Sequence, residues 1–190
     1  DKKGQVHIFQ VRPVAVNHDH YELDIENIAH SLDRDVSRYH DLQNHMPNIS
    51  GTRTVFANMP DWNPAEMIGV VPYPLAMSLY RELITKRVWS TAREKMGYRK
   101  MPNVELMVSL FGRAYIDVRN SINSFLPEGL ESEVSEKLVN AYIERLDKNP
   151  HLHDKIEFDV VPTAYDFDFE EAFESRYPAL LNREELLQYR

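Results

Sequence analysis

The sequence of 190 residues contains no cysteine, so it can form no disulfide, no thiolate metal site and no cysteine nucleophile. It lacks an apolar run of the roughly 20 residues that a membrane-spanning helix needs, and its polar N-terminus lacks the apolar core of a signal peptide. Because 30 acidic residues outnumber 22 basic ones, the chain also lacks the net positive charge of proteins that coat nucleic acid or anionic membranes. These absences predict a cytoplasmic protein with neither nucleic acid nor membrane as partner.

Glycine is scarce as well, with six residues spread widely along the chain. Neither Gly-x-x-x-x-Gly-Lys nor Gly-x-Gly-x-x-Gly occurs, so no loop can cradle a nucleotide by backbone amides alone. The Gly-x-Ser-x-Gly turn that would expose a serine nucleophile is also missing. Any contact with phosphate must therefore use side chains.

The most informative stretch is 6–13, Val-His-Ile-Phe-Gln-Val-Arg-Pro, which reads as an apolar strand stopped by proline. Because side chains alternate along a strand, Gln10 and Arg12 share a face, where carboxamide and guanidinium can hold a polyphosphate. Lys3-Gly4 suits a hairpin turn, so we expect the second arm of a hairpin that was cut from something larger. On local pattern alone, a solvated sheet edge is the simpler interpretation.

Hydrophobic periodicity predicts an α+β fold rich in helix. The longest helices are expected over 24–45, with Asp24 as N-cap, and over 75–96, ended by Gly97. Apolar residues recur at three- and four-residue steps through the first, and the second is expected to bury Leu75, Leu79, Leu83 and Val88. The other expected elements are a strand at 54–57, a helix from Asn63 to Gly69, two strands within 105–118, a helix burying Val134, Leu138, Tyr142 and Leu146, a strand at 155–162, and two short helices capped by Asp168 and Asn182.

The loop from Asn58 to Glu66, Asn-Met-Pro-Asp-Trp-Asn-Pro-Ala-Glu, is rigid in the way that sites and docking surfaces often are. A helix entry with Trp62 packed as a plug explains it equally well. The segment 86–100 carries six basic residues against one acid and could meet phosphates, although a solvated helix face is the simpler account.

Two His-x-His pairs, at 18–20 and 151–153, raise the question of a metal site. Neither has the His-Glu-x-x-His spacing of zinc hydrolases, and such pairs are common in turns without metal. We therefore nominate no metal ligand and no catalytic residue.

The stretch 6–13 resembles the closing strand of the ATP-grasp, phosphoenolpyruvate (PEP)/pyruvate-binding domain of PEP synthase, pyruvate phosphate dikinase and rifampicin phosphotransferase. In that family a Gln-x-Arg pair faces the ATP phosphates, so the resemblance assigns this contact to Gln10 and Arg12. The segment 58–75 is similar to the one that leaves that domain. Gly-Arg-Ala-Tyr-Ile-Asp at 112–117 resembles a Gly-Arg-x-Tyr-x-Asn stretch of the middle region, with Asp117 where Asn is more usual. More broadly, 53–168 looks like a bacterial subgroup of PEP synthase-like, PEP-utilising proteins.

The resemblance implies that the chain is a fragment, with the last ATP-grasp strand at 1–16, a helical connector at 17–53 and a truncated α+β middle domain with a small antiparallel sheet at 54–190. In the intact phosphotransferase, ATP with Mg²⁺ would phosphorylate a histidine on a mobile domain, which passes the phosphoryl group to an acceptor such as pyruvate. The family's metal-binding Glu, the ATP-grasp body and the phosphohistidine domain are missing from the sequence given. The chain alone is therefore expected to be inactive and to bind no cofactor tightly, with those domains and a small-molecule acceptor as its partners.

A second interpretation belongs to a different class of function. The chain could be a noncatalytic α+β interaction module that uses the 58–66 loop and the basic segment 86–100 as its docking surface.

Overall fold

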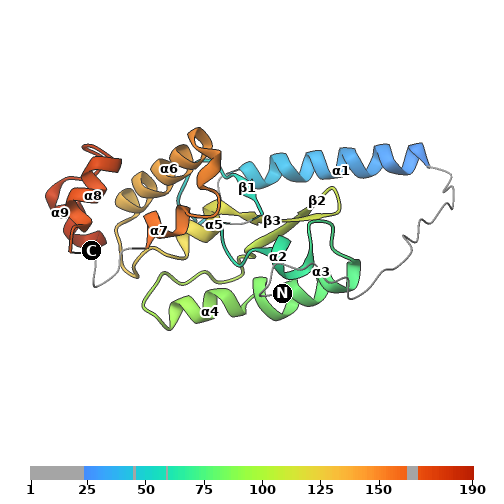
Figure 1. Cartoon of the computed structure of the whole chain (residues 1–190), viewed down its shortest axis with the longest axis horizontal. Helices are drawn as coiled ribbons and strands as arrows, with labels where there is room; N and C mark the ends of the chain where they lie inside the picture. Colours follow the sequence, from blue (N-terminus) through green and yellow to red (C-terminus); the bar gives the residue numbers. More distant parts are fainter. Residues whose placement is uncertain (1–23, 45, 59, 162–166) are drawn as a thin grey trace, which may run out of the picture.

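A computed structural model describes residues 24–44, 46–58, 60–161 and 167–190, which form an α+β fold with one small sheet among helices (Figure 1). In chain order the elements are α1 (Ile25–Gln43), β1 (Phe56–Ala57), α2 (Pro64–Ile68), α3 (Pro74–Tyr80), the π-helix η1 (Arg81–Thr85), α4 (Val88–Glu94), β2 (Met107–Leu110), β3 (Arg113–Asp117), α5 (Val118–Asn123), α6 (Ser132–Lys148), the 3₁₀-helix η2 (Pro150–Leu152), α7 (Ile156–Val160), α8 (Phe169–Arg176) and α9 (Arg183–Tyr189). None of these helices is both long and apolar enough to cross a membrane.

The sheet is antiparallel, with strand order β1-β3-β2. The β2–β3 hairpin turns at Phe111 and Gly112, whose φ angles are +53° and +72°. Positive φ at both central residues is the backbone of a tight hairpin turn whose twist matches that of the strands. The hairpin predicted within 105–118 is thus confirmed, as is the short strand near residues 54–57.

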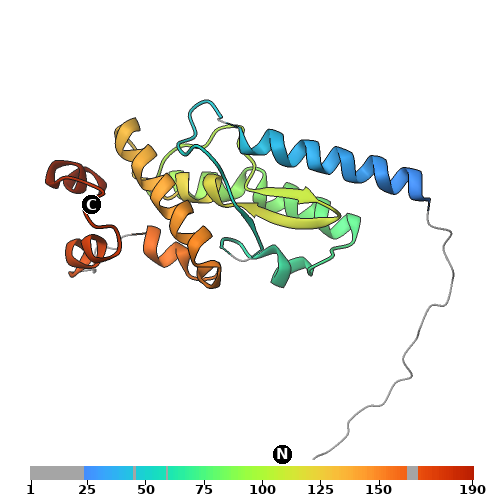
Figure 2. The same cartoon turned by 90° about the horizontal axis from the view of Figure 1, so that it is seen from above.

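Two hydrophobic cores lie at different places in the molecule. One lies on the side of the sheet where α3 and α4 run and includes Trp89, Leu106 and Ile116. The other surrounds α6 and draws Tyr142 and Tyr189 together with the C-terminal helices. Figures 1 and 2 show α6 to α9 gathered at one end, while the first turns of α1 extend beyond the sheet at the other.

Several helix signals in the sequence are confirmed by the capping contacts. The Asp24 carboxylate accepts from the Asn27 amide at 3.0 Å, and α1 ends at Gln43, close to the expected end. Asn63 caps α2, and Asn182 forms a reciprocal capping box with Glu185 at the start of α9. Asp168 stands at the N-cap position of α8 but makes no side-chain capping bond there.

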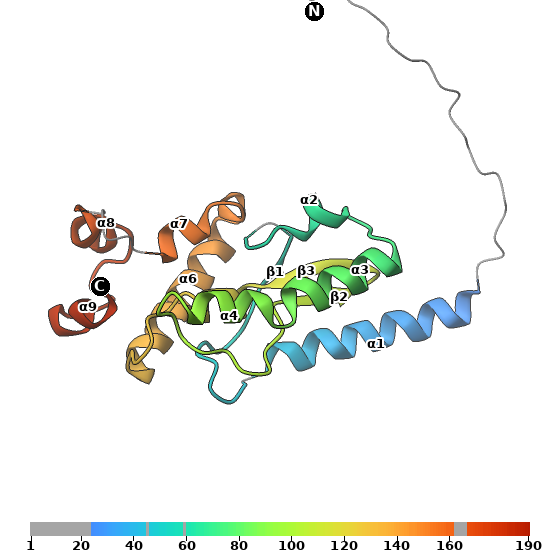
Figure 3. The same ribbon diagram turned by 90° about the horizontal axis from the view of Figure 1, so that it is seen from below.

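The predicted helix over 75–96 is wrong in two respects. It is interrupted by the π-turn of η1, in which the Lys86 amide donates to the Arg81 carbonyl at 2.9 Å, and α4 starts anew at Val88. The face expected to be buried is exposed: Leu75, Leu79, Leu83 and Val88 are 70%, 50%, 65% and 51% exposed. Figure 3 shows α3 and α4 running along the sheet.

The buried side of this helical run carries Tyr80, Thr85 and Trp89 instead. The hydrogen bond of a π-turn joins residues five apart, whereas that of an α-turn joins residues four apart. Tyr80 and Thr85, which are five residues apart across this turn, are both buried. The aromatic rings of Tyr80 and Trp89 fill the space beside the sheet. The prediction from sequence periodicity treated the segment as one regular helix and therefore placed its leucines on the buried side.

The strand predicted at 155–162 is also wrong, because residues 156–160 form the short helix α7. Ile156 and Val160 are buried one helical turn apart, whereas Phe158, which lies between them, is exposed. Two arginines, Arg145 at 2.9 Å and Arg176 at 2.7 Å, bind the Asp159 carboxylate and fix this turn against α6 and α8. These partners are distant in sequence, so the alternating pattern could not reveal them.

Candidate functional site

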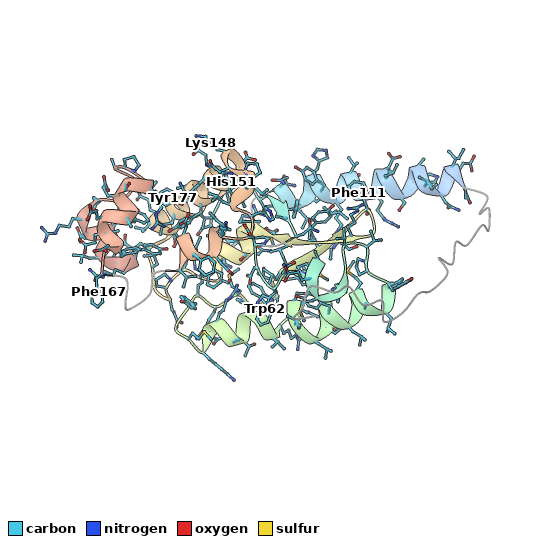
Figure 4. All side chains as sticks on the ribbon, viewed as in Figure 1. Trp62, Phe111, Lys148, His151, Phe167 and Tyr177 are labelled. Atoms are coloured by element: carbon cyan, nitrogen blue, oxygen red, sulfur yellow. The ribbon has the colours of Figure 1, made fainter. Side chains whose placement is uncertain are left out.

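The residues predicted to face ATP lie outside the described part of the chain. Gln10 and Arg12 belong to residues 1–23, and so does the first His-x-His pair. Their assignment to ATP phosphates therefore stays a prediction. The second pair, at 151–153, follows the end of α6 and is not buried (Figure 4 labels His151). Across 24–161 and 167–190, apart from positions 45 and 59, no group of three potential ligands from His, Asp or Glu could hold a metal ion.

The predicted loop at 58–66 is anchored at both ends. The Asn58 carboxamide donates to the Ala114 carbonyl of β3 at 3.0 Å, and the Asn63 side chain caps α2. The prediction that Trp62 packs as a plug is wrong, because it is 42% exposed with φ at +48° (Figure 4). Its carbonyl accepts from the Tyr80 hydroxyl, whose pKa is raised to about 12 by burial and by the charge of Asp61.

Asp61 is the charged residue that this loop buries, whereas Trp62 is exposed. Its two carboxylate oxygens accept from Nη2 of Arg93 at 2.6 and 2.7 Å, and one also accepts from the Ser121 hydroxyl at 2.7 Å. Arg93 also donates to Ser124, and its guanidinium lies 3.8 Å from the ring centroid of Phe125. Because carboxylate and guanidinium satisfy each other, this cluster fastens the loop to α4 and α5.

The loop 58–66 and the basic segment 86–100, which the sequence offered together as a docking surface, are thus bound to each other through Asp61 and Arg93. The rest of the basic segment does not form one patch. Lys86 pairs with Glu82 at 2.8 Å, and Lys100 lies 3.6 Å from Glu94. A uniformly solvated helix face does not describe a segment whose Arg93 is buried.

Beside the loop lies an open cavity of about 510 Å³ with an acidic wall. It is lined by Asp61, Trp62, Asn63, Glu66, Met67, Ile84, Asp154 and Glu157. Burial, and secondly the charge of Asp61, raises the pKa of the Glu157 carboxyl, while Arg93 opposes this. The wall is therefore a place where negative charge is crowded and only partly compensated.

A second buried polar cluster forms where β3 meets α5. Asp117 is fully buried and caps α5; its Oδ1 accepts from the Thr54 hydroxyl at 2.6 Å and from the Asn120 amide at 3.1 Å. Burial raises the pKa of this carboxyl, and the hydrogen bond from Thr54 is the largest opposing influence. Oδ2 has no partner among the described residues.

Arg119 completes this cluster and holds the chain that leads away from α1. Its guanidinium donates to the carbonyls of Leu42 at 2.8 Å and Asn44 at 3.0 Å, near the end of α1, and to that of Gly51. Sequence reasoning missed both Arg119 and Arg93, because a lone arginine in a polar run is usually a surface residue. The one available signal was the polar composition of 117–124, directly after a strand of the core.

Comparison of the chain with protein-family models, with curated proteins and with solved structures gives no match.

Proposed function

We propose that this chain is part of an ATP-dependent phosphotransferase of the PEP synthase-like kind, and that its described body is a structural region between catalytic domains. Support comes from three separate stretches, 6–13, 58–75 and 112–117, that resemble the same family in the same order along the chain. In this proposal Arg12 neutralises charge that develops on the transferred phosphoryl group, and Gln10 orients a phosphate oxygen. Mg²⁺, held by residues outside this chain, would complete that site.

The observation that carries the structural role is an exposed apolar ridge, which we define as Tyr73, Leu75, Leu79 and Leu83. These four side chains are 50–84% exposed, and the three leucines follow one another at four-residue steps along α3 and η1. The first turns of α1 present Ile25, Ile28 and Leu32 to solvent in the same way. Large exposed apolar side chains in a row mark surfaces that pack against other protein. In the proposed enzyme, neighbouring domains of the same polypeptide cover the ridge.

The first test concerns phosphoryl transfer in the intact polypeptide that contains this chain. Arg12→Ala is expected to lower the rate of phosphohistidine formation from radiolabelled ATP by about 10²-fold or more, as losses of single charge-stabilising donors do. Arg12→Lys keeps the charge but loses the guanidinium fork, so its rate of phosphohistidine formation should lie between those of Arg12→Ala and the parent. Arg183→Ala, at an exposed position at the start of α9, serves as the matched control. Unchanged phosphohistidine formation in Arg12→Ala would sink the assignment.

The ridge also favours the second candidate, an interaction module whose partner is a separate protein, and one experiment separates the two. Because the chain has no cysteine, Leu79→Cys introduces a single thiol on the ridge and Lys148→Cys one on the exposed end of α6. In the isolated chain both should react rapidly with a maleimide. If neighbouring domains cover the ridge, only Leu79→Cys is protected in the intact polypeptide. Equal reactivity there would leave the ridge free for another protein and favour the module.

A further inference from the structure

A second open cavity, of about 370 Å³, lies between the 48–51 loop and the start of α6. Its lining residues are Asn48, Ile49, Ser50, Arg99, Lys100, Ser132 and Glu136. The volume is at the lower end of the range that small-molecule sites occupy. Arg99 is the member of this set whose surroundings require an explanation.

The guanidinium of Arg99 is held by neutral groups. Nη1 donates to the Ser50 hydroxyl at 3.0 Å and to the Asn123 carboxamide at 2.9 Å, and Nη2 donates to the Ser135 hydroxyl at 3.2 Å. No ion pair joins it to a carboxylate in the part of the chain that the structure describes. Partial burial removes water from the charge and lowers the pKa of the group, although an arginine stays charged in proteins. Buried charges are usually paired, because desolvation without a counter-charge is costly.

Arg81 of the same chain shows which contact the remaining N–H donors of Arg99 can make. Arg81 grips the Glu105 carboxylate through Nε at 2.8 Å and Nη2 at 2.6 Å, the two-pronged contact that guanidinium makes with planar oxyanions. In Arg99 the Nε–H and the second N–H of Nη2 have no acceptor within the described residues. The equivalent donors of Arg99 are therefore not used by the described residues, and Arg99 lines the cavity.

Lys100 and the start of α6 add positive potential beside Arg99. Lys100 follows Arg99 in the chain. Its Nζ forms two long ion pairs, at 3.6 Å with Glu94 and at 3.5 Å with Glu128. The α6 helix begins at Ser132, and its N-cap residue makes no side-chain capping bond, so the first amides of a 17-residue helix keep their partial positive charge.

The loop that carries Ser50 is held rigidly. Ser50 exchanges two hydrogen bonds with Asn123, at 2.9 Å from its amide and 2.8 Å to its carbonyl. At Gly51, φ is +102°, and an added Cβ would lie 2.6 Å from Val139 of α6, so the backbone is packed directly against that helix. A hydroxyl held in this way needs no rearrangement to meet a ligand.

Glu136 restricts which anion can enter. One of its carboxylate oxygens accepts from the Gly51 amide at 2.7 Å and the other from the Asn140 carboxamide at 3.2 Å. Its charge faces the same cavity, so a ligand gains most if it places an oxyanion on Arg99 and a hydrogen-bond donor towards Glu136.

We infer that this cavity is a binding site for a small oxyanion, the phosphate or carboxylate group of a metabolite-sized molecule, with Arg99 as its principal ligand and Ser50, Lys100 and the start of α6 in support. The inference goes beyond the proposed function and does not depend on it, because it uses no residue assigned to ATP.

The test is an NMR titration of the full chain with inorganic phosphate, and separately with acetate, against chloride at constant ionic strength. We expect saturable shifts of the Ser50, Gly51 and Ser132 amides with at least one of the two anions, and the anion that saturates identifies the source. Arg99→Gln should raise the dissociation constant at least about tenfold. Arg113→Gln, which removes an equally charged exposed arginine, should leave it unchanged.

Two results would overturn the inference. One is a response that is linear, or spread over the surface, in the parent chain for both anions. The other is an Arg99→Gln variant that is folded, as judged by circular dichroism, and binds with parental affinity. If Arg99→Gln fails to fold, the parent titration and Lys100→Gln, which should weaken binding about threefold or more, decide the matter.

Discussion

The helix α6 and the helical run of α3 and η1 have the same spacing of apolar residues, but these residues are buried in α6 and exposed in the other run. In α6, Leu138 and Leu146 are buried, whereas Leu79 and Leu83 of the other run face solvent. Both patterns predict an amphipathic helix, and each segment is indeed helical. The spacing of apolar residues therefore identifies the apolar face of a helix, but it does not reveal whether the partner for that face lies in the same chain.

The difference lies in what the other side of each helix offers. The side of α6 opposite its leucines is polar, so its apolar side is the one that can enter a core. The run from α3 to α4 has a second, buried side with Tyr80, Trp89 and Arg93. The aromatic rings pack beside the sheet, and the Arg93–Asp61 ion pair joins this side to the 58–66 loop. With that side attached, the leucines become the outer surface.

The largest expected effect comes from breaking this polar attachment. Arg93→Ala leaves Asp61 buried without its counter-charge, and loss of one partner of a buried pair typically costs about 3–5 kcal/mol of unfolding free energy. Urea unfolding followed by circular dichroism measures this cost. Lys95→Ala, which removes an exposed cation just after α4, should change stability by less than about 0.5 kcal/mol. Similar small effects of both substitutions would mean that aromatic packing alone holds α4 in place.

The next test sets the two leucine faces against each other directly. In the isolated chain, Leu138→Ala should lower the unfolding free energy by about 2–5 kcal/mol, because it removes a fully buried side chain and leaves a cavity. Leu79→Ala should change it by less than about 0.5 kcal/mol. The comparison of the helices fails if Leu79→Ala costs as much as Leu138→Ala when both are measured by urea unfolding.

What the sequence predicted well is local. Asp24, Asn63 and Asn182 mark helix starts because capping bonds join residues two or three positions apart, and the hairpin turn at 111–112 is set by its own two residues. The same reasoning failed for α7, where the decisive contacts come from elsewhere in the fold.

The polar interior was the least predictable part of the candidate sites. Arg93, Arg99 and Arg119 each bind partners at least 24 residues away along the chain, and nothing in the neighbouring sequence indicates these partners. The ATP-facing role of Gln10 and Arg12 rests on resemblance and stays a prediction.

The smallest expected effect concerns Asp117, the buried N-cap residue of α5. The buried carboxyl has a raised pKa, so the folded protein keeps its proton at pH values where the unfolded chain, with a pKa of about 3.9, has lost it. The folded state then binds more protons than the unfolded state, and stability falls as pH rises through this interval. Asn supplies the same Oδ1 to Thr54 and Asn120 and does not titrate.

Asp117→Asn should therefore gain stability relative to the parent as pH rises from about 4 to 7, in urea unfolding repeated across that range. Asp168→Asn is the matched control, since Asp168 also stands at an N-cap position but is exposed and makes no capping bond. A difference between parent and Asp117→Asn that stays constant with pH would show that the carboxyl is ionised throughout. The hydrogen bonds from Thr54 and Asn120, together with the charge of Arg119, would then outweigh the desolvation of Asp117. This interior would resemble the Asp61–Arg93 pair that attaches α4, rather than a neutral cap of α5.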